Sequence, residues 1–269
     1  MNVENLEFHA KNIRRNIVKM IYGSQSGHPG GSLSIVEILT YLYFERMNIK
    51  PEDPLFEDRD RLILSKGHCA PALYATLAER EFFPEEDLMG FRKIDGYLEG
   101  HPDMKKVPGI DMSTGSLGQG MSVTNGIALS GKLDKKDYKV YCILGDGEIE
   151  EGEVWEAFMT ASHYKLDNVC AIIDRNGLQI DGKTKNVMST EPLEDKMRAF
   201  GFHVITINGN SFEEVKKAFD DADIVKDKPT AIIADTIKGK GVSFMENEVG
   251  WHGKAPNKEE YDKAMEELK

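Results

Sequence analysis

The sequence is poor in cysteine, has fewer basic than acidic residues, and has no long apolar run. Its three cysteines (Cys69, Cys142 and Cys170) are an odd number without C-x-x-C spacing, so we expect neither a disulfide framework nor a zinc site. Lys and Arg total 34 against 46 Asp and Glu, and this net charge of −12 disfavours nucleic acid and anionic membranes as partners.

Apolar runs reach only about five residues, whereas a membrane-spanning helix needs about 20. The N-terminus lacks the basic and apolar regions of a secretory signal. We therefore expect a soluble protein of a reducing compartment, the cytoplasm.

Hydrophobic periodicity predicts alternating helices and strands. The predicted strands are short, apolar and rich in β-branched residues: 61–65, 140–144, 169–173, 203–207 and 230–234. The predicted helices lie before, between and after them: the first 20 residues, 38–43 behind a capping box at 34–37, 70–80, 153–164, 193–200, 212–222 behind a capping box at 211–214, and 259–268. Buried strands that alternate with helices predict an α/β fold, doubly wound, with a mostly parallel sheet and helices on both faces. We expect a single domain over 1–269, with 85–115 as a long irregular segment of the kind that is usually functional.

Two polar residues follow consecutive predicted strands. Asp146 stands in Gly145-Asp-Gly147 after the strand 140–144, and Asn176 follows the strand 169–173. In a right-handed crossover both strands are parallel, so both residues emerge at the carboxyl edge of the sheet, where ligands bind. A carboxylate and an amide oxygen with a nearby carbonyl suit Mg²⁺. Each motif alone is also typical of a simple turn.

Four of the seven histidines are next to glycine: His28, His68, His101 and His252. An imidazole on a loop can hydrogen-bond sugar hydroxyls or carry protons near neutral pH. The alternative for each is a partly exposed loop histidine without a function. The other three histidines lie within predicted helices or strands, and we assign them no role.

Taken together, the motifs resemble a known family. Gly145-Asp-Gly147, then 28 intervening residues and Asn176, resembles the thiamine diphosphate–Mg²⁺ signature. Further runs resemble, in family order, the N-terminal, diphosphate-binding half of transketolases: Ser26-Gly-His-Pro-Gly-Gly31, Ser65-Lys-Gly-His68, Glu99-Gly-His-Pro102, Ser113-Thr-Gly-Ser-Leu-Gly-Gln-Gly120, Glu151-Gly152, Asn176-x-x-x-Ile180-Asp-Gly182 and Gly250-Trp-His-Gly253. The resemblance covers nearly the whole chain and implies a thiamine diphosphate-binding fold.

The resemblance implies roles for individual residues. Asp146 and Asn176 would bind Mg²⁺ through their side chains and Leu178 through its carbonyl. His28 and His101 match positions near the substrate hydroxyls, and His68 and His252 match positions near the diphosphate and the reacting centre. The implied cofactor contacts are His68, Gly115, Ser116, Leu117, Gly147, Asn176, Ile180, Ile237 and His252. Ser116 replaces a proline that is common in full-length relatives.

Two neighbouring segments allow other interpretations. Residues 115–120 could be a dinucleotide-binding loop, but their spacing is G-x-x-G-x-G and no strong strand precedes them, so we discount this. The acidic group Glu148, Glu150, Glu151, Glu153 and Glu156 is typical of a solvated first helical turn. In the family, positions matching Glu151 and Glu156 belong to a carboxylate network between subunits, and we leave both interpretations open.

Full-length transketolases are more than twice this long, and their pyrimidine-binding domain is missing here. We therefore expect the N-terminal subunit of a split transketolase, active only with a separate C-terminal subunit. The expected assembly is a heterotetramer with two copies of each. The expected reaction moves a two-carbon ketol unit from a ketose phosphate to an aldose, as in the pentose phosphate pathway. Alternatives are a related sugar enzyme subunit, with a sulfonated, deoxy or branched substrate or a deoxyxylulose phosphate synthase-like reaction, and a non-catalytic diphosphate-binding module.

Overall fold

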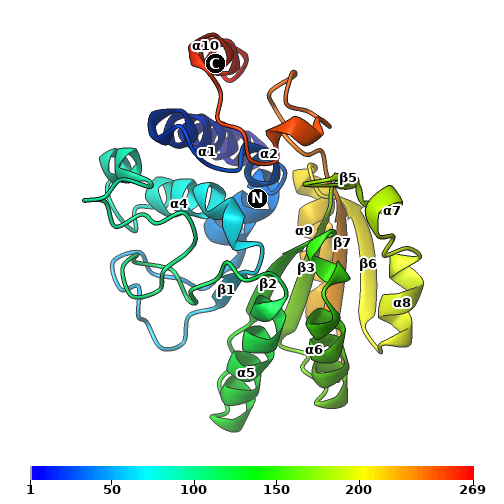
Figure 1. Ribbon diagram of the computed structural model, residues 1–269. Coiled ribbons are helices and arrows are strands. Elements are labelled where there is room, and N and C mark those ends of the chain that lie inside the picture. Colours follow the sequence, from blue (N-terminus) through cyan, green and yellow to red (C-terminus); the bar gives the residue numbers. More distant parts are fainter. Residues whose placement is uncertain (1) are drawn as a thin grey trace.

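A five-stranded parallel sheet forms the centre of the molecule. The computed structural model describes residues 2–269, and the strand order in the sheet is β1-β2-β3-β7-β6 (Figure 1). The five strands are β1 (Arg61–Leu64), β2 (Val140–Gly145), β3 (Val169–Arg175), β6 (His203–Asn208) and β7 (Thr230–Asp235). All five were predicted from the sequence within two residues, because buried parallel strands give continuous apolar runs.

Helices cover both faces of the sheet, as predicted. The helices are α1 (Val3–Ser24), α2 (Pro29–Leu33), α3 (Val36–Tyr41), α4 (Ala70–Glu79), α5 (Gln119–Leu133), α6 (Gly152–His163), α7 (Thr184–Val187), α8 (Leu193–Ala199), α9 (Phe212–Asp223) and α10 (Lys258–Glu267). Alternate side chains of β2 enter opposite cores: Ile143 packs in the cluster of α1, α3, α4 and α9, and Leu144 in that of α5, α6 and α8. Helices thus pack against both faces of the parallel sheet, which is the doubly wound arrangement.

The local predictions miss several elements. Helices α2, α5 and α7 were not predicted, nor were the two short strands at Leu178–Gln179 and Gly182–Lys183. The capping box at 34–37 is wrong, because α3 begins after Ile35 without a side-chain cap. The hydroxyl of Ser34 instead donates to a carboxylate oxygen of Asp174 at 2.8 Å. Ser211 does cap α9, where its side chain accepts a hydrogen bond from the backbone N–H of Glu214.

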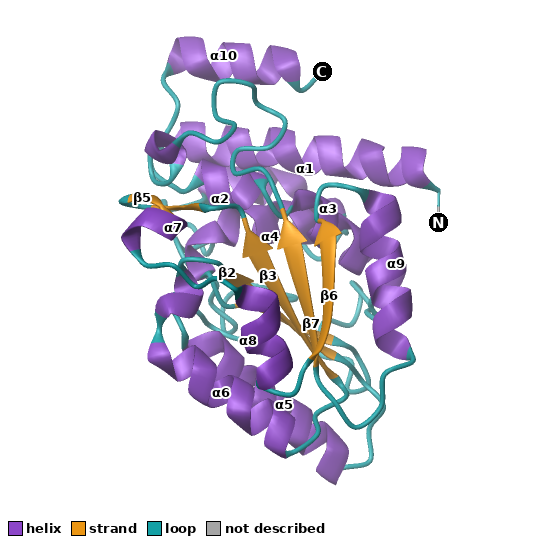
Figure 2. Cartoon of the chain, turned by 90° about the vertical axis from the view of Figure 1, so that its right-hand side faces the viewer, coloured by secondary structure: helices purple, strands orange, loops and turns teal. Residues whose placement is uncertain are grey.

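The carboxyl edge of the sheet gathers segments that are far apart in the sequence. Figure 2 shows the strands pointing towards α2 and the small hairpin of β4 (Leu178–Gln179) and β5 (Gly182–Lys183). Residues 91–118, within and beyond the predicted irregular segment, contain no helix or strand. Within 2–269, no helix is both long and apolar enough to cross a membrane.

Candidate active site

Asp146 is a buried carboxylate at the end of β2. Its two oxygens accept hydrogen bonds from the backbone N–H groups of Gly147, at 3.0 Å, and Gly177, at 2.7 Å. Only 3% of the residue is exposed, and it forms no ion pair within 4 Å with any other described residue. Burial, together with the negative charge of nearby Asp174, raises the pKa of Asp146 to about 6. The fold therefore holds a carboxylate whose charge lacks a direct partner.

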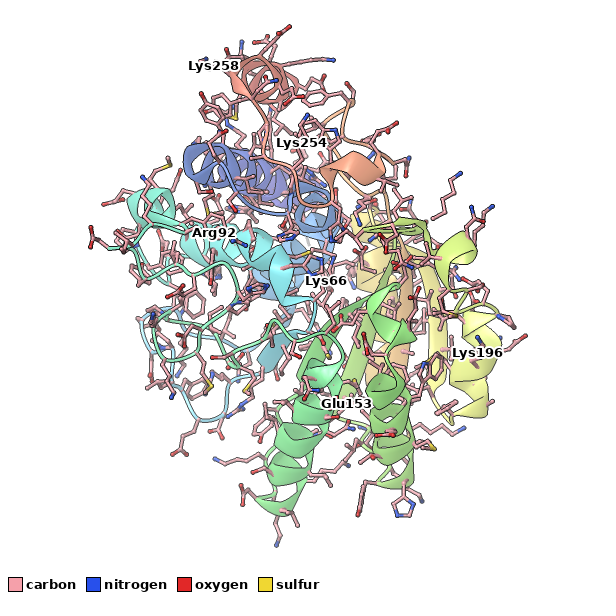
Figure 3. All side chains as sticks on the ribbon, in the orientation of Figure 1. Lys66, Arg92, Glu153, Lys196, Lys254 and Lys258 are labelled. Carbon is pink, nitrogen blue, oxygen red and sulfur yellow. The ribbon has the colours of Figure 1, made fainter. Side chains whose placement is uncertain are left out.

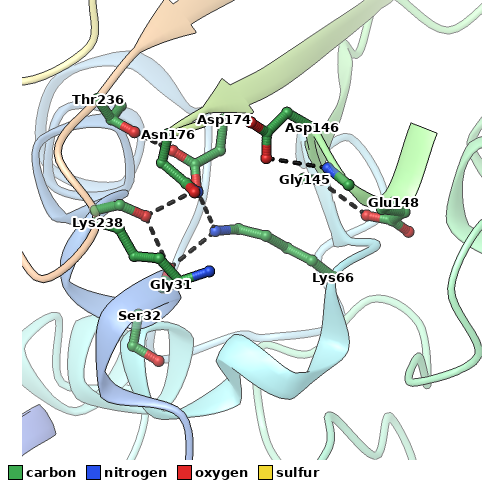
Figure 4. A network of polar contacts seen from close by, with 12 residues as sticks. Gly31, Ser32, Lys66, Gly145, Asp146, Glu148, Asp174, Asn176, Thr236 and Lys238 are labelled. Carbon is green, nitrogen blue, oxygen red and sulfur yellow. Dashed lines mark hydrogen bonds and ion pairs between the residues drawn. The ribbon is translucent and has the colours of Figure 1, made fainter. Parts of the chain in front are cut away.

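A second buried carboxylate, Asp174 in β3, is fully neutralised. The ammonium group of Lys66 donates to Asp174 at 2.6 Å and to the carbonyl of Gly31 at 2.8 Å (Figure 4). The hydroxyls of Ser34 and Thr236 also donate to Asp174. Burial alone would raise the pKa of this carboxyl, but the charge and hydrogen bond of Lys66 outweigh it and lower the pKa below its usual value.

A second buried lysine, Lys238, bridges the chain segments on the other side of the site. Its ammonium group donates to the carbonyl of Leu178 at 2.9 Å and to Nδ1 of His252 at 3.1 Å. Because an ammonium group only donates, Nδ1 of His252 must accept, and the ring proton lies on Nε2. Burial and the nearby charge of Lys66 lower the pKa of Lys238. Asn176 stands between these groups, with its amide nitrogen 2.8 Å from Asp174.

The predicted magnesium ligands lie together and their chemistry fits the ion. Asp146 offers an uncompensated carboxylate, and Asn176 and Leu178 offer amide and carbonyl oxygens, the hard donors that Mg²⁺ takes. Among the described residues no three His, Cys, Asp or Glu side chains are grouped to hold a metal. A magnesium ion here would therefore need carbonyl oxygens and oxygens from a ligand. The carbonyl of Leu178 accepts one hydrogen bond from Lys238 and keeps a second lone pair for an ion.

Three of the four predicted histidines face one another. The ring centroids of His28, His68 and His252 lie 5.1 to 5.5 Å apart. Burial lowers the pKa of His28 and His68 to about 4 each, with contributions from His68 and Lys66 respectively. Burial and the charge of Lys238 lower the pKa of His252 to about 3. All three rings are thus neutral at pH 7. Nδ1 of His28 is buried without a hydrogen-bond partner, so a donor or acceptor position remains for a ligand.

The fourth histidine, His101, is placed differently. Its ring packs against Gly115, where an added Cβ would lie 3.0 Å from the ring. Gly115 has φ +148°, a conformation that side chains rarely adopt, so glycine is required at this close approach. His101 lines a separate, open cavity of about 470 Å³ next to the three histidines.

The central cavity has a volume of about 290 Å³ and joins these groups. The residues that line it are His28, Gly31, Lys66, His68, Gly115, Leu117, Gly145, Asp146, Gly147, Glu148, Asn176, Leu178, Gln179, Ile180, Lys238 and His252. Two predicted cofactor contacts, Ser116 and Ile237, are not among them. The backbone N–H of Ile237 donates to the side chain of Asn210 instead.

Sequence reasoning missed several polar residues of the site. Lys66 lies inside the quoted Ser65-Lys-Gly-His68 motif, but its role depends on Asp174, which is distant in sequence. Glu148 was placed among solvated acidic residues, yet it is only 3% exposed. Its carboxylate accepts from the hydroxyl of Ser65 and from two backbone N–H groups. The solvated interpretation is therefore wrong for Glu148, because its side chain turns back to the last residue of β2, where the N–H of Gly145 donates to it.

The geometry first defines a class of protein: an α/β enzyme domain with buried charges and neutral histidines at the carboxyl edge of a parallel sheet, where such folds bind cofactors. Residues 7–268 match the family model of the transketolase thiamine diphosphate binding domain. The chain belongs to the transketolase family and is a transketolase-type enzyme subunit.

This chain matches two kinds of relatives, subunits of about its own length and single-chain transketolases that are more than twice as long. It is 44% identical to one subunit of the apulose-4-phosphate transketolase from Phocaeicola vulgatus, over 100% of this chain and 95% of that relative. It is 45% identical to 6-deoxy-6-sulfo-D-fructose transketolase subunit SqwG from Clostridium sp., over 98% and 96%. Human transketolase is 43% identical over 96% of this chain, which spans only 41% of that protein. The crystal structure of transketolase from Campylobacter jejuni aligns with a TM-score of 0.94 and 34% identity, over 100% of this chain and 43% of that one.

Proposed function

We propose that this chain is the N-terminal subunit of a two-subunit transketolase and works with a separate C-terminal subunit. The observation that carries the proposal is the pattern of coverage: the chain matches subunit relatives over 95% and 96% of their length, and the human single-chain enzyme over 41%. We further propose an assembly of two copies of each subunit. Leu117 and Ile180, which line the cavity, are 40% and 67% exposed, and a partner would cover them.

We propose that the cavity binds thiamine diphosphate together with Mg²⁺. Asp146, Asn176 and the carbonyl of Leu178 would hold the ion, and its charge would neutralise Asp146. The ammonium group of Lys238, buried at the cavity wall, offers positive charge to a diphosphate, whereas the charge of Lys66 is balanced by Asp174. The backbone of Gly115, Leu117 and Gly147 would contact the cofactor, as would the side chain of Ile180.

The reaction that we propose is transfer of a two-carbon ketol unit from a ketose to an aldose. When bound, thiamine diphosphate supplies the carbon nucleophile for such chemistry. The contribution of this chain is to bind and orient the sugar. The neutral rings of His28, His68 and His252 can each donate and accept a hydrogen bond, so they can hold hydroxyl groups and pass protons without competing charges. In His252 the proton lies on Nε2, because Lys238 fixes Nδ1 as an acceptor.

The substrate class stays open between two kinds of sugar. The names of the similar subunits refer to a sugar phosphate and to a sulfonated sugar, and we propose a ketose with an anionic terminal group. A non-catalytic diphosphate-binding module is the less favoured alternative, because three neutral histidines serve no purpose in binding a diphosphate alone. The three cysteines are free and buried, which fits the proposed cytoplasmic location.

The first test is calorimetric titration of the purified chain with thiamine diphosphate, with and without Mg²⁺. We expect binding that depends on Mg²⁺ and that is lost in Asp146→Ala. Asp137→Asn is the matched control, because Asp137 is exposed and far from the cavity. If the chain binds no cofactor alone or in a natively purified complex, the cofactor proposal is wrong. If native purification recovers no second chain, the two-subunit proposal is wrong.

A further inference from the structure

Glu148 is a buried carboxylate of the central cavity to which the proposed function gives no role. Only 3% of the residue is exposed, and it follows Asp146 by two positions. Its Oε1 accepts hydrogen bonds from the hydroxyl of Ser65 and, at 3.0 Å, from the backbone N–H of Gly118. Its Oε2 accepts from the backbone N–H of Gly145 at 3.0 Å (Figure 4). All three donors are neutral, so an ion pair does not explain why this carboxylate is buried.

The three donors belong to segments that are far apart in the sequence. Ser65 directly follows β1, Gly145 is the last residue of β2, and Gly118 is the residue before α5. Ser65 and Gly118 lie 83 and 30 residues from Glu148. The first turn of α5 packs closely on Ser65, since a Cβ on Gly120 would lie 2.4 Å from the Ser65 hydroxyl oxygen. Glu148 therefore joins the ends of β1 and β2 to the start of α5.

The cofactor loop, residues 115–117, is held at both ends. Two of its residues line the central cavity. Before the loop, the hydroxyl of Thr114 donates to the last carbonyl of β1 at 2.7 Å. After the loop, the N–H of Gly118 donates to Glu148. Since the same carboxylate also holds the residue directly before Asp146, it fixes the distance between the cofactor loop and Asp146.

A neutral amide could not replace this carboxylate. The three donors converge on two oxygens, and an amide has only one oxygen, with an NH₂ group in place of the other. If the amide oxygen accepts from Gly118, the NH₂ group faces the N–H of Gly145. If the amide is turned round, the NH₂ group faces the N–H of Gly118 instead. In Glu148→Gln one of the two backbone attachments is therefore lost in either orientation.

We propose that Glu148 is a positioning residue, which holds the cofactor loop and the Asp146 turn (residues 145–147) in the relative arrangement that binding of thiamine diphosphate and Mg²⁺ needs. This inference rests on the proposed function and extends it to a residue whose carboxylate oxygens are occupied by protein donors. Groups that hold binding residues in place reduce the ordering that a ligand must supply, so their loss weakens binding without removing a contact to the ligand.

The test begins with calorimetric titration of the purified chain with thiamine diphosphate at saturating Mg²⁺. For Glu148→Gln we expect Kd to rise about tenfold or more, because an attachment of the cofactor loop or of the Asp146 turn is lost. Ser65→Ala keeps both backbone attachments, so its Kd should stay within about threefold of the wild-type value.

Glu153→Gln is the matched control. The carboxylate of Glu153 accepts from the side chains of Gln119 and Ser122, so it also joins α6 to the start of α5 but meets none of the three donors. Figure 3 labels Glu153 by the ribbons of these two helices, and the residue does not line the central cavity. Its replacement should leave Kd unchanged.

A second measurement needs no cofactor. In NMR spectra of the full chain, Glu148→Gln should lower the heteronuclear NOE of the loop amides of Ser116 and Leu117 or of the turn amide of Gly147, according to which attachment is lost. Glu153→Gln should lower none of them. A purely structural role would lower the midpoint of urea unfolding and leave Kd and these NOE values unchanged. If Glu148→Gln does not fold, Glu148→Asp replaces it, because the shorter side chain cannot reach all three donors.

A Kd for Glu148→Gln within about threefold of the wild-type value would overturn the inference, whatever the effect on unfolding. If the wild-type chain binds no cofactor, the titrations are made on the complex purified with its partner. If neither form binds it, the proposed function fails, and Glu148 is then judged by the NOE values alone. Unchanged values at all three amides would reject the positioning role, and lowered values would support it.

Discussion

Carboxylates are buried at both ends of the strands of the central sheet, which are called here its amino and carboxyl edges, but with different consequences. At the amino edge, Asp60 accepts from the backbone N–H groups of Asn48 and Lys139, and Asp111 pairs with Arg59 and accepts from the N–H of Leu62. The space beside them is about 10 Å³, room for one water at most, since a water needs roughly 10–15 Å³. At the carboxyl edge, Asp146 opens into a cavity of about 290 Å³.

The two ends of the sheet thus differ in what their carboxylates do: at one end they hold the fold together, and at the other Asp146 is open to a ligand. At the amino edge each carboxylate accepts hydrogen bonds that join loops to the sheet, and the space beside it is too small for a cofactor. At the carboxyl edge Asp174 is neutralised by a lysine, whereas Asp146 is left with a raised pKa beside open space. Buried charge without a partner is costly in a folded chain, so its presence in a cavity indicates a ligand that supplies the missing charge. Four predictions test this contrast.

The largest expected effect is on stability at the neutralised pair. Lys66→Met leaves Asp174 buried without its counter-charge and should lower the free energy of unfolding by about 3–5 kcal/mol. The double variant Lys66→Met/Asp174→Asn removes both charges and keeps an oxygen for Ser34 and Thr236. It should recover at least half of the loss in urea unfolding. If the double variant is no more stable than Lys66→Met, the charge pair is not the cause.

A comparable effect is expected on turnover at the histidines. His28→Ala or His252→Ala should lower kcat of the assembled enzyme by about 10²–10³-fold, because proton handling and hydroxyl binding are lost. Thiamine diphosphate affinity should change much less. Steady-state kinetics and calorimetry measure the two quantities, and His163→Ala on exposed α6 is the control. Unchanged turnover would contradict the roles proposed for these rings.

The third effect is a pH dependence at Asp146. Its folded pKa of about 6 lies above the ordinary value of 3.8, so the favourable contribution to stability is complete below about pH 4 and is lost as pH rises through 6. Relative to Asp146→Asn, the wild type without ligands should lose about 3 kcal/mol between pH 4 and pH 7. Urea unfolding at several pH values measures this, with Asp137→Asn as control. A difference between Asp146→Asn and wild type that does not vary with pH would show that the carboxylate is already neutralised.

The smallest effect is expected at the amino edge. Asp111→Asn breaks the ion pair with Arg59 and should reduce stability by about 1–3 kcal/mol. Thiamine diphosphate affinity should stay unchanged, because Asp111 lies at the opposite end of the strands. Altered cofactor affinity in this variant would remove the distinction between the two edges.

Much of the fold could be predicted because its signals are local. The strand 140–144 and its neighbours are continuous apolar runs, and a parallel sheet places the residues that follow them at one edge. That rule brought Asp146 and Asn176 together correctly. Ser34 shows the limit of local reasoning. Its spacing to Glu37 is that of a capping box, but Ser34 has helical backbone angles at the end of α2, and its hydroxyl donates to Asp174, which is distant in sequence.

The sequence by itself determined the alternation of strands and helices, the motifs that identify the family, and the carboxyl edge as the place of the site. Only the tertiary structure determined which charged and polar groups pair with one another. It paired Lys66 with Asp174 rather than Asp146 and joined Lys238 to His252. These outcomes depend on distances between segments up to 108 residues apart. Electrostatic interactions fall off over a few ångströms inside a protein, so no local pattern can encode which partner is nearest.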